Sequence, residues 1–204
     1  MSQPPASSRN LALRQAKYHD RNPIVRYANR RFMDTIHRLT SPLAWQSMLD
    51  LGCGEGMVLE RVFARHSGQV VGMDLDQARV ALARRTVRAA HFLVGDAHAL
   101  PFADCTFDLV ISLEVLEHVG RPEDVLREIG RVCRRYVLLS VPNEPWWRLG
   151  NMARLKYLKE WGNTPEHIHH WTVGGFKRWV ERTFTILRTA TPFLWTFVLA
   201  EKRQ

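Results

Sequence analysis

The sequence predicts an α/β fold in which a mostly parallel sheet carries helices on both faces. Three observations support this prediction: short apolar runs bounded by Gly, Asp or Pro, helical stretches between those runs, and a glycine-rich turn directly after the first run. The chain has 204 residues, of which 46% are hydrophobic, so it can bury one sizeable core. Its 24% of charged residues is near the globular average, which excludes a disordered, collagen-like or disulfide-scaffold protein.

The predicted strands alternate with predicted helices along the middle of the chain. Each run is apolar on both faces, which is typical of strands covered by helices on both sides. The expected strands are 47–51, 69–73, 91–94, 107–113 and 136–141. The expected helices are 57–66, 77–89 and 123–134. This order favours crossover connections and therefore a parallel sheet.

Two further segments flank this alternating region. Before it, residues 24–39 have helical spacing, with one apolar face formed by Ile24, Ala28, Phe32 and Ile36. After it, residues 176–184 are expected to be helical, and 185–191 and 194–200 to be strands. The link between the last two runs is long enough for a hairpin but too short for a crossover, so the final strand is expected to be antiparallel.

The net charge of +9 is concentrated in the two flanks. Residues 1–43 hold eight basic and two acidic side chains, and residues 144–204 hold ten and five, whereas residues 44–143 are slightly acidic. Such a balance favours an anionic partner: nucleic acid, a membrane surface or an acidic small molecule. We expect residues 1–43 to be a basic tail and helix capping the site, and residues 44–204 to be a single domain.

The glycine loop is the sharpest local feature. Residues 50–56 read Asp-Leu-Gly-Cys-Gly-Glu-Gly, between the first expected strand and the following helix. Glycines at alternate positions let the backbone turn tightly and approach a ligand without obstruction by Cβ atoms. The spacing differs from the G-x-G-x-x-G pattern of dinucleotide-binding loops. A glycine-rich turn without a ligand is the competing interpretation.

Acidic residues at the next two strand ends favour a ligand. Asp74 follows the second strand, where its carboxylate can accept hydrogen bonds from ribose hydroxyls, and Asp96 follows the third strand. Asp76 is better explained as the cap of the helix that starts at Gln77. Because ligands of open α/β sheets bind at the carboxyl ends of the strands, these residues predict one site for a ribose-containing molecule.

In these motifs the sequence resembles the class I S-adenosylmethionine-dependent methyltransferases. The resemblance covers residues 45–143 and rests on DLGCGEG, VGMDLD, GDAHALPFADCTFDLV and EVLEHV in combination. It implies a Rossmann-like, seven-stranded, mostly parallel sheet with an antiparallel last strand, and S-adenosylmethionine as cofactor. One departure is that Cys133-Arg134-Arg135-Tyr136 stands where relatives carry a Lys-Pro-Gly-Gly turn, which predicts a shorter turn away from the cofactor.

The resemblance also implies cofactor roles for individual residues. Asp50, Gly52 and Gly54 would enclose the methionine part. Asp74 would bind the ribose, and Leu75 would lie beside the adenine. Asp96 and Ala97 would contact the edge of the adenine. Leu113 and Glu114 would lie close to the methionine end of the cofactor.

The methyl acceptor is expected on the side of the N-terminal helix, the fourth strand end and the segment 144–171, which we predict to be an insertion or lid. This segment is rich in tryptophan, which suits an aromatic or lipophilic acceptor. His118 and His169 are the candidates for acid/base catalysis or acceptor positioning. Further candidates for acceptor contact are Tyr18, Tyr27, Trp146, Tyr157, His167 and His170.

A metal site is the competing interpretation of the histidines. His167 and His169 can lie on one side of an extended segment, and with Glu166 they offer three ligands. No second ligand cluster accompanies them in the sequence, so we expect no metal.

The sequence favours S-adenosylmethionine-dependent methylation of a small acceptor, which is anionic or lipophilic, with peripheral contact to a membrane surface as one way to reach it. A nucleic-acid methyltransferase ranks lower, because Ser112-Leu113-Glu114-Val115 stands where enzymes acting on base nitrogens carry an (Asp/Asn)-Pro-Pro-(Tyr/Phe) element. A non-catalytic cofactor-binding regulator is the other alternative. Three cysteines without CxxC spacing, and no apolar leader, predict a cytoplasmic location. The oligomeric state stays open.

Overall fold

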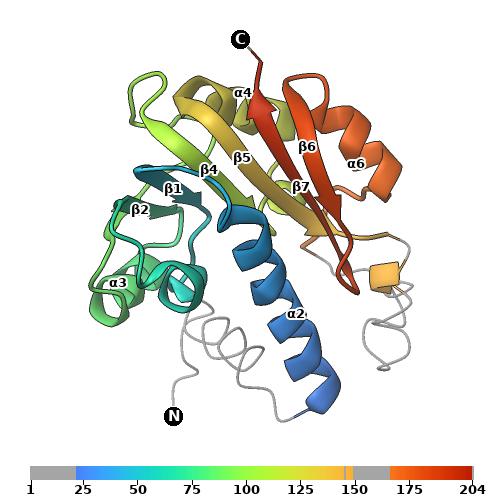
Figure 1. The fold of residues 1–204 in the computed structure, drawn as a ribbon, viewed down its shortest axis with the longest axis horizontal. Coiled ribbons are helices and arrows are strands. Elements are labelled where there is room, and N and C mark those ends of the chain that lie inside the picture. The colour runs from blue at the N-terminus through green and yellow to red at the C-terminus, as the bar shows by residue number, and fades with distance from the viewer. Residues whose placement is uncertain (1–21, 145, 149–165, 204) are drawn as a thin grey trace, which may run out of the picture.

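A computed structural model describes residues 22–144, 146–148 and 166–203 of the chain. The core of the fold is a seven-stranded sheet with the order β3-β2-β1-β4-β5-β7-β6 (Figure 1). Its strands are β1 (Ser47–Leu51), β2 (Gln69–Asp74), β3 (His91–Val94), β4 (Phe107–Leu113), β5 (Cys133–Pro142), β6 (Phe184–Ala190) and β7 (Trp195–Lys202). The first five strands pair in parallel, whereas β7 is antiparallel to both β5 and β6, which confirms the predicted sheet.

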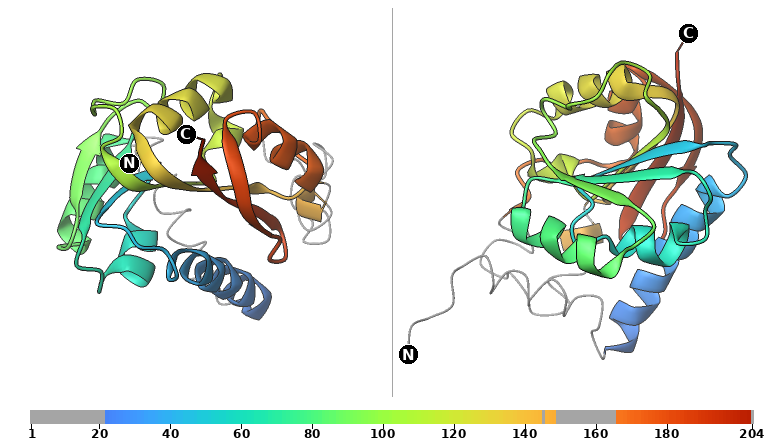
Figure 2. Two further views of the ribbon diagram at one scale, coloured as in Figure 1. Left: turned by 45° about the horizontal axis from the view of Figure 1, so that its top comes forward. Right: turned by 90° about the vertical axis from the view of Figure 1, so that its left-hand side faces the viewer.

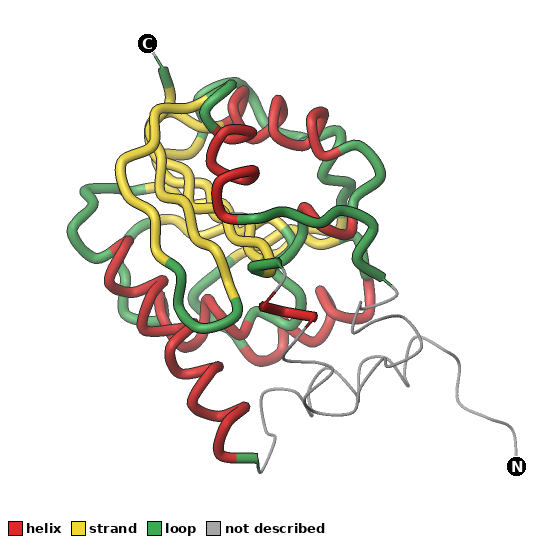
Figure 3. The backbone as a smooth tube through the Cα atoms, turned by 90° about the vertical axis from the view of Figure 1, so that its right-hand side faces the viewer, coloured by secondary structure: helices red, strands yellow, loops and turns green. Residues whose placement is uncertain are grey.

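Helices cover both faces of the sheet (Figures 2 and 3). The helical elements are α2 (Pro23–Thr40), the π-helix η1 (Leu59–Phe63), α3 (Gln77–Thr86), the 3-10 helix η2 (Leu116–His118), α4 (Pro122–Val132) and α6 (Val173–Val180). One buried cluster joins α2, η1 and α3 to one face of the strands, and a second joins α4 and α6 to the other. Neighbouring residues of a strand therefore serve different cores: Met48 belongs to the first cluster and Leu49 to the second.

Helix α2 packs into the first of these cores. Asn22 caps the helix, because its side-chain oxygen accepts a hydrogen bond from the backbone N–H of Ile24 at 2.9 Å. Phe32 reaches β7, where its ring centroid lies 4.9 Å from that of Trp195 and 5.0 Å from that of Phe197. The predicted apolar face was wrong at one position: Ile24 is 61% exposed, and the buried face begins at Val25. At helical spacing, Val25 rather than Ile24 continues the buried stripe of Ala28, Phe32 and Ile36, so Ile24 faces outward.

The connection between α4 and β5 confirms the predicted shortening. Helix α4 ends at Val132 and β5 begins at Cys133, so no turn residue separates them. The sulfur of Cys133 lies 3.2 Å from the carbonyl oxygen of Tyr136. All three cysteines are free thiols.

The strand order places the carboxyl ends of the central strands side by side. Strand β1 pairs with β2 on one side and with β4 on the other, and the chain order reverses at this point. Because ligands of open α/β sheets bind where the strand order reverses, the carboxyl edge at β1 is the place where the topology predicts a ligand.

None of the helices in the described part of the chain combines the length and the hydrophobicity that crossing a membrane requires.

We predict that Phe32→Ala lowers the free energy of unfolding by about 3–5 kcal/mol, because it leaves a cavity between α2 and β7. Urea denaturation followed by circular dichroism measures this change. Tyr27→Ala, on the exposed side of the same helix, is the control and should change stability by less than about 0.5 kcal/mol. Equal effects of the two variants would contradict the docking of α2 described above.

Candidate functional site

The glycine loop follows β1 and is held against the end of β2. The carbonyl oxygen of Met73 accepts hydrogen bonds from the backbone N–H groups of Gly52 at 2.7 Å and Cys53 at 3.1 Å. Gly52, Gly54 and Gly56 all have positive φ, a conformation that other residues adopt at a cost. At Gly52 a Cβ would also lie 2.2 Å from Cγ2 of Val115. The loop therefore needs glycine for its shape.

Gly54 faces open space. A Cβ built on Gly54 meets no atom within 4 Å, in contrast to one built on Gly52 or Gly56. Its backbone N–H donates to Oδ2 of Asp74 at 2.9 Å, which ties the loop to the end of β2. A loop that combines close backbone packing on one side with open space at Gly54 fits the methionine part of a cofactor.

Asp74 is fixed in position by two backbone donors. Besides Gly54, the N–H of Asp76 donates to its Oδ1 at 2.9 Å. Each carboxylate oxygen has two lone pairs, so the group can still accept two ribose hydroxyls. Leu75, placed by the sequence beside the adenine, is 72% exposed at this edge. Asp76 caps α3 through the N–H groups of Ala78 and Arg79, as predicted.

Asp96 follows β3 and forms a pair that the sequence did not reveal. Its Oδ1 lies 2.7 Å from Nδ1 of His98 and accepts the backbone N–H of His98 at 2.9 Å. The backbone hydrogen bond of His98 lowers the pKa of Asp96, and the hydrogen bond from its ring adds to this effect. Asp96 is therefore an anion at neutral pH, with Ala97 next to it in the turn. The Asp-x-His spacing was the signal available in the sequence.

Asp50 is buried near the end of strand β1, directly before the glycine loop. Burial raises its pKa to about 7, and the nearby charge of Asp74 adds to the shift. Among the residues that the structure describes, nothing donates a hydrogen bond to its Oδ2. Asp50 thus titrates near neutrality at the place where the resemblance puts the methionine part of the cofactor.

Glu114 stands at the end of β4 in a strained conformation. Its φ is +58°, which is rare for a residue with a side chain and is often found at functional sites. Its Oε1 accepts from the hydroxyl of Ser140 at 3.2 Å, and its Oε2 accepts from the indole N–H of Trp195 at 2.8 Å. These contacts fix the carboxylate between β5 and β7. Leu113, the last residue of β4, is buried beneath it.

The acceptor-side histidines meet the turn that follows β4. The carbonyl oxygen of Glu117 accepts the N–H groups of Ile168 at 2.9 Å and His169 at 3.3 Å. His118 directs Nδ1 at the carbonyl oxygen of Glu166 at 2.9 Å, and Nε2 of His169 lies 3.0 Å from that of Val119. These hydrogen bonds join residues 117–119, after β4, to residues 166–169, which lie about 50 residues further along the chain.

The other predicted acceptor residues lie at different places. His167 is buried beside Trp147, with ring centroids 5.6 Å apart. Nδ1 of His170 lies 3.6 Å from Oε1 of the buried Glu144, and burial, with a contribution from Arg148, lowers the pKa of His170. Trp146 and Tyr27 are exposed. Tyr18 and Tyr157 lie outside the described residues.

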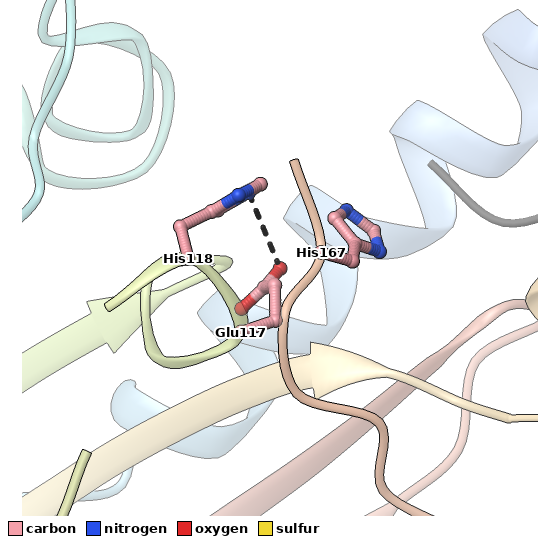
Figure 4. Close-up of side chains that lie close together, drawn as sticks. All are labelled: Glu117, His118 and His167. Carbon is pink, nitrogen blue, oxygen red and sulfur yellow. Dashed lines mark ion pairs between the residues drawn. The ribbon is translucent and has the colours of Figure 1, made fainter. Parts of the chain in front are cut away.

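The predicted metal ligands are grouped differently in the structure. Among the described residues, the one group of three metal-ligating side chains is Glu117, His118 and His167, whose ligand atoms lie within 4.8 Å of one another (Figure 4). Glu166 and His169, which the sequence joined to His167, are not part of it. Glu117 was missed, although an acidic residue directly before a histidine in an apolar turn was a usable signal.

Fold and site geometry together define an α/β domain whose candidate ligand site lies at the carboxyl edge of β1, β2 and β4. Residues 49–140 match the family model of the methyltransferase domain. The matched region contains the glycine loop, Asp74, Asp96 and Glu114, so the candidate site lies in the part of the chain that is similar to methyltransferase domains.

Curated relatives match about half of the chain. Norajmaline N-methyltransferase of Rauvolfia serpentina is 39% identical over 94 residues, which are 43% of this chain and 32% of the relative. An O-methyltransferase of Pyrenophora dematioidea is 29% identical over 115 residues, 53% of this chain and 43% of the relative. The chain thus spans less than half the length of these relatives.

Solved structures share the fold over nearly the whole chain. The magnesium protoporphyrin IX methyltransferase of Synechocystis, solved with SAH bound, superimposes with a TM-score of 0.74 at 19% identity. The superposition covers 97% of this chain and 96% of that one. The similarity therefore includes the elements outside the matched family region.

We predict that Asp74→Ala abolishes binding of S-adenosylmethionine, because it removes the ribose acceptor and releases Gly54 from β2. Isothermal titration calorimetry measures the affinity. Asp76→Asn is the matched control: it removes a charge from the same strand end, preserves the helix cap and should bind the cofactor within about threefold of the native affinity. Unchanged affinity of Asp74→Ala would refute the ribose assignment.

The raised pKa of Asp50 predicts a pH-dependent stability. The folded-state pKa of about 7 exceeds the ordinary value, so the folded chain holds a proton that the unfolded chain releases. The stabilising contribution of this proton is complete below about pH 4 and is lost as the pH rises through about 7. Asp50→Asn removes this dependence.

The free energy of unfolding of Asp50→Asn relative to the native protein should therefore rise by about 1.4 kcal/mol per pH unit between about pH 4.5 and 7 and then level off. Urea titrations at several pH values measure it. Parallel curves for the two proteins across this range would show that Asp50 does not titrate there.

Proposed function

We propose that this protein transfers the methyl group of S-adenosylmethionine to a small, aromatic or lipophilic acceptor. The observation that carries this proposal is the row of rings next to the end of β4. Trp147 lies between His167 and Trp195, with ring centroids 5.6 Å from the first and 6.1 Å from the second. Flat side chains packed around a catalytic edge favour a ring or an apolar chain as the acceptor.

The named relatives are consistent with this class of acceptor. The matched enzymes of Rauvolfia and Pyrenophora are named as an N-methyltransferase of norajmaline and as an O-methyltransferase, and the Synechocystis structure is that of a porphyrin methyltransferase. Because these names include both an N-methyltransferase and an O-methyltransferase, they do not specify which acceptor atom the present protein methylates.

The basic flank supports an acceptor that carries negative charge or is reached at an anionic surface. On the exposed side of α2, Arg30 and Arg31 are solvent-facing, and Arg30 is balanced by Asp34 at 3.8 Å. Two apolar side chains are also exposed, Trp146 at 59% and Ile24 at 61%. Contact with a lipid surface and a cytoplasmic location stay predictions from the sequence.

His118 and His169 are proposed to serve the acceptor in different ways. A carbonyl oxygen only accepts, so the hydrogen of His118 is on Nδ1 and its Nε2 presents a lone pair that can take up a proton from an O–H or N–H acceptor. By the same reasoning His169 donates from Nε2 to Val119. It joins the acceptor segment to η2 and acts as a positioning residue.

The transfer itself needs little covalent participation from the protein. The acceptor atom forms a bond to the methyl carbon while the carbon–sulfur bond breaks, and the electron pair of that bond remains on sulfur. Holding the acceptor in line and close to the methyl group supplies most of the acceleration. A rigid loop under the cofactor and an anchored segment above the acceptor provide this alignment.

The direct test is transfer of radiolabelled methyl groups to a panel of phenols, aromatic carboxylates, quinols and apolar amines, with total RNA as a separate arm. The proposal predicts labelled small-molecule product. Label in RNA, with turnover that falls steeply with salt, would favour a nucleic-acid methyltransferase. Cofactor binding without transfer to any acceptor would favour a non-catalytic regulator.

We predict that His169→Ala lowers kcat about tenfold to a hundredfold, while the affinity for S-adenosylmethionine changes less than about twofold. His169→Gln keeps an N–H donor for the carbonyl oxygen of Val119 and should recover a large part of the loss. His37→Ala, an exposed histidine of α2, is the control. Retained activity in His169→Ala would mean that this contact does not position the acceptor.

A further inference from the structure

We propose that Glu117, His118 and His167 form a binding site for a divalent first-row transition-metal ion. Glu117 and His118 belong to η2 after β4, and His167 comes from the segment that precedes α6 (Figure 4). Their ligand atoms all lie within 4.8 Å of one another. The site thus joins the turn that follows β4 to the segment that precedes α6.

The hydrogen-bonding of His118 prepares it as a ligand. Because Nδ1 donates to the carbonyl oxygen of Glu166 at 2.9 Å, the lone pair of the neutral imidazole is on Nε2. Metal-binding histidines usually have their second ring nitrogen fixed in this way by a carbonyl or carboxylate oxygen. The tautomer needed for coordination is therefore the one that the backbone selects.

The lone pair of His118 faces a carboxylate. Its Nε2 lies 3.8 Å from Oε1 of Glu117, whose side chain is almost fully buried. The imidazole nitrogen and the carboxylate oxygen are both electron-pair donors that can coordinate a cation. A divalent cation would be attracted by both atoms, and the low exposure of Glu117 strengthens that attraction.

The third ligand is held in place by the backbone. The N–H groups of Ile168 and His169 donate to the carbonyl oxygen of Glu117, at 2.9 Å and 3.3 Å. These hydrogen bonds hold the neighbouring His167 close to η2. The ring of His167 is buried, and its centroid lies 4.9 Å from that of His118, at an interplanar angle of 74°. Rings set edge to face can direct nitrogens at a common point without stacking.

The ligand set indicates the class of ion. Two imidazoles and one carboxylate suit Mn²⁺, Fe²⁺, Co²⁺, Ni²⁺ or Zn²⁺ better than Mg²⁺ or Ca²⁺, which prefer oxygen ligands. With metal–ligand bonds of about 2.0–2.2 Å, ligand atoms lie roughly 3–3.5 Å apart, so these side chains need to move by only about 1 Å. Glu114 does not belong to this group of ligand atoms, and its two oxygens accept hydrogen bonds from Ser140 and Trp195.

Three protein ligands leave coordination positions open, as in catalytic metal sites. Resting on the proposed function, we assign an open position to an acceptor hydroxyl or phenol oxygen, which narrows the substrate class to oxygen acceptors. Coordination makes such an O–H group more acidic. Because the ion then occupies Nε2 of His118, that nitrogen does not act as the base when the ion is bound, and the proton passes to solvent. The oxygen then bonds to the methyl carbon as the carbon–sulfur bond breaks, which yields a methyl ether and a neutral thioether.

Titration with Co²⁺ tests the site. The untagged, full-length chain is treated with EDTA, freed of the chelator and titrated with CoCl₂ while the visible absorption is recorded. We expect saturation at one Co²⁺ per chain. His118→Ala, His167→Ala and Glu117→Gln should each weaken the affinity at least about tenfold. His91→Ala, an exposed histidine of β3, should leave it unchanged.

The choice of variants separates coordination from misfolding. His118 is exposed, so its replacement should preserve the fold, and Glu117→Gln keeps the shape of a buried side chain while it removes the charge. Native circular dichroism with weakened Co²⁺ binding in either variant supports the site. Absence of saturable binding to the native chain, or equal affinity in His118→Ala and His91→Ala, would overturn it.

Failure of the metal site can be distinguished from failure of the proposed function. Co²⁺ binding is measured without S-adenosylmethionine or an acceptor. Methyl transfer that persists undiminished in EDTA, in a chain that binds no Co²⁺, would refute the metal site and preserve the function. Saturable Co²⁺ binding in a chain that methylates none of the acceptors would preserve the site and refute the function.

Discussion

The parallel pairing of β1 with both β2 and β4 is the constraint on which the rest of the structure depends. It brings the carboxyl ends of these strands to one edge, at the point where the chain order reverses. The glycine loop, Asp74 and Glu114 are far apart in the chain, yet each follows one of these strands directly. Any ligand that contacts the loop is consequently within reach of the other two.

The site is held by backbone geometry that ordinary side chains resist. Three glycines of the loop have positive φ, and Glu114 adopts a similar value without the freedom of glycine. The hydrogen bonds from Ser140 and Trp195 to its carboxylate stabilise that conformation. Strain of this kind persists only where neighbouring contacts determine it. Here those contacts come from β5, which is the neighbour of β4, and from β7 next to it.

Two kinds of interaction distinguish the proposed cofactor side of this edge from the proposed acceptor side. On the first side, backbone N–H groups and carboxylates dominate, as at Gly54 and Asp74. On the second side, imidazole and indole rings gather around η2, and carbonyl oxygens orient His118 and His169. A polar, hydrogen-bonding surface suits a charged cofactor, whereas rings suit an apolar acceptor brought to the methyl group.

The sequence by itself determined the sheet, the antiparallel last strand and the residues at each strand end, because hydrophobic periodicity and glycine spacing are local properties. Ile24 was misassigned because Val25, its neighbour in the first turn, is the residue that lies on the buried stripe of the helix. Only the tertiary structure decided that Glu117 and His118 lie against His167, and that His98 pairs with Asp96. The grouping around Glu117 depends on hydrogen bonds between segments about 50 residues apart, and no local pattern encodes such contacts.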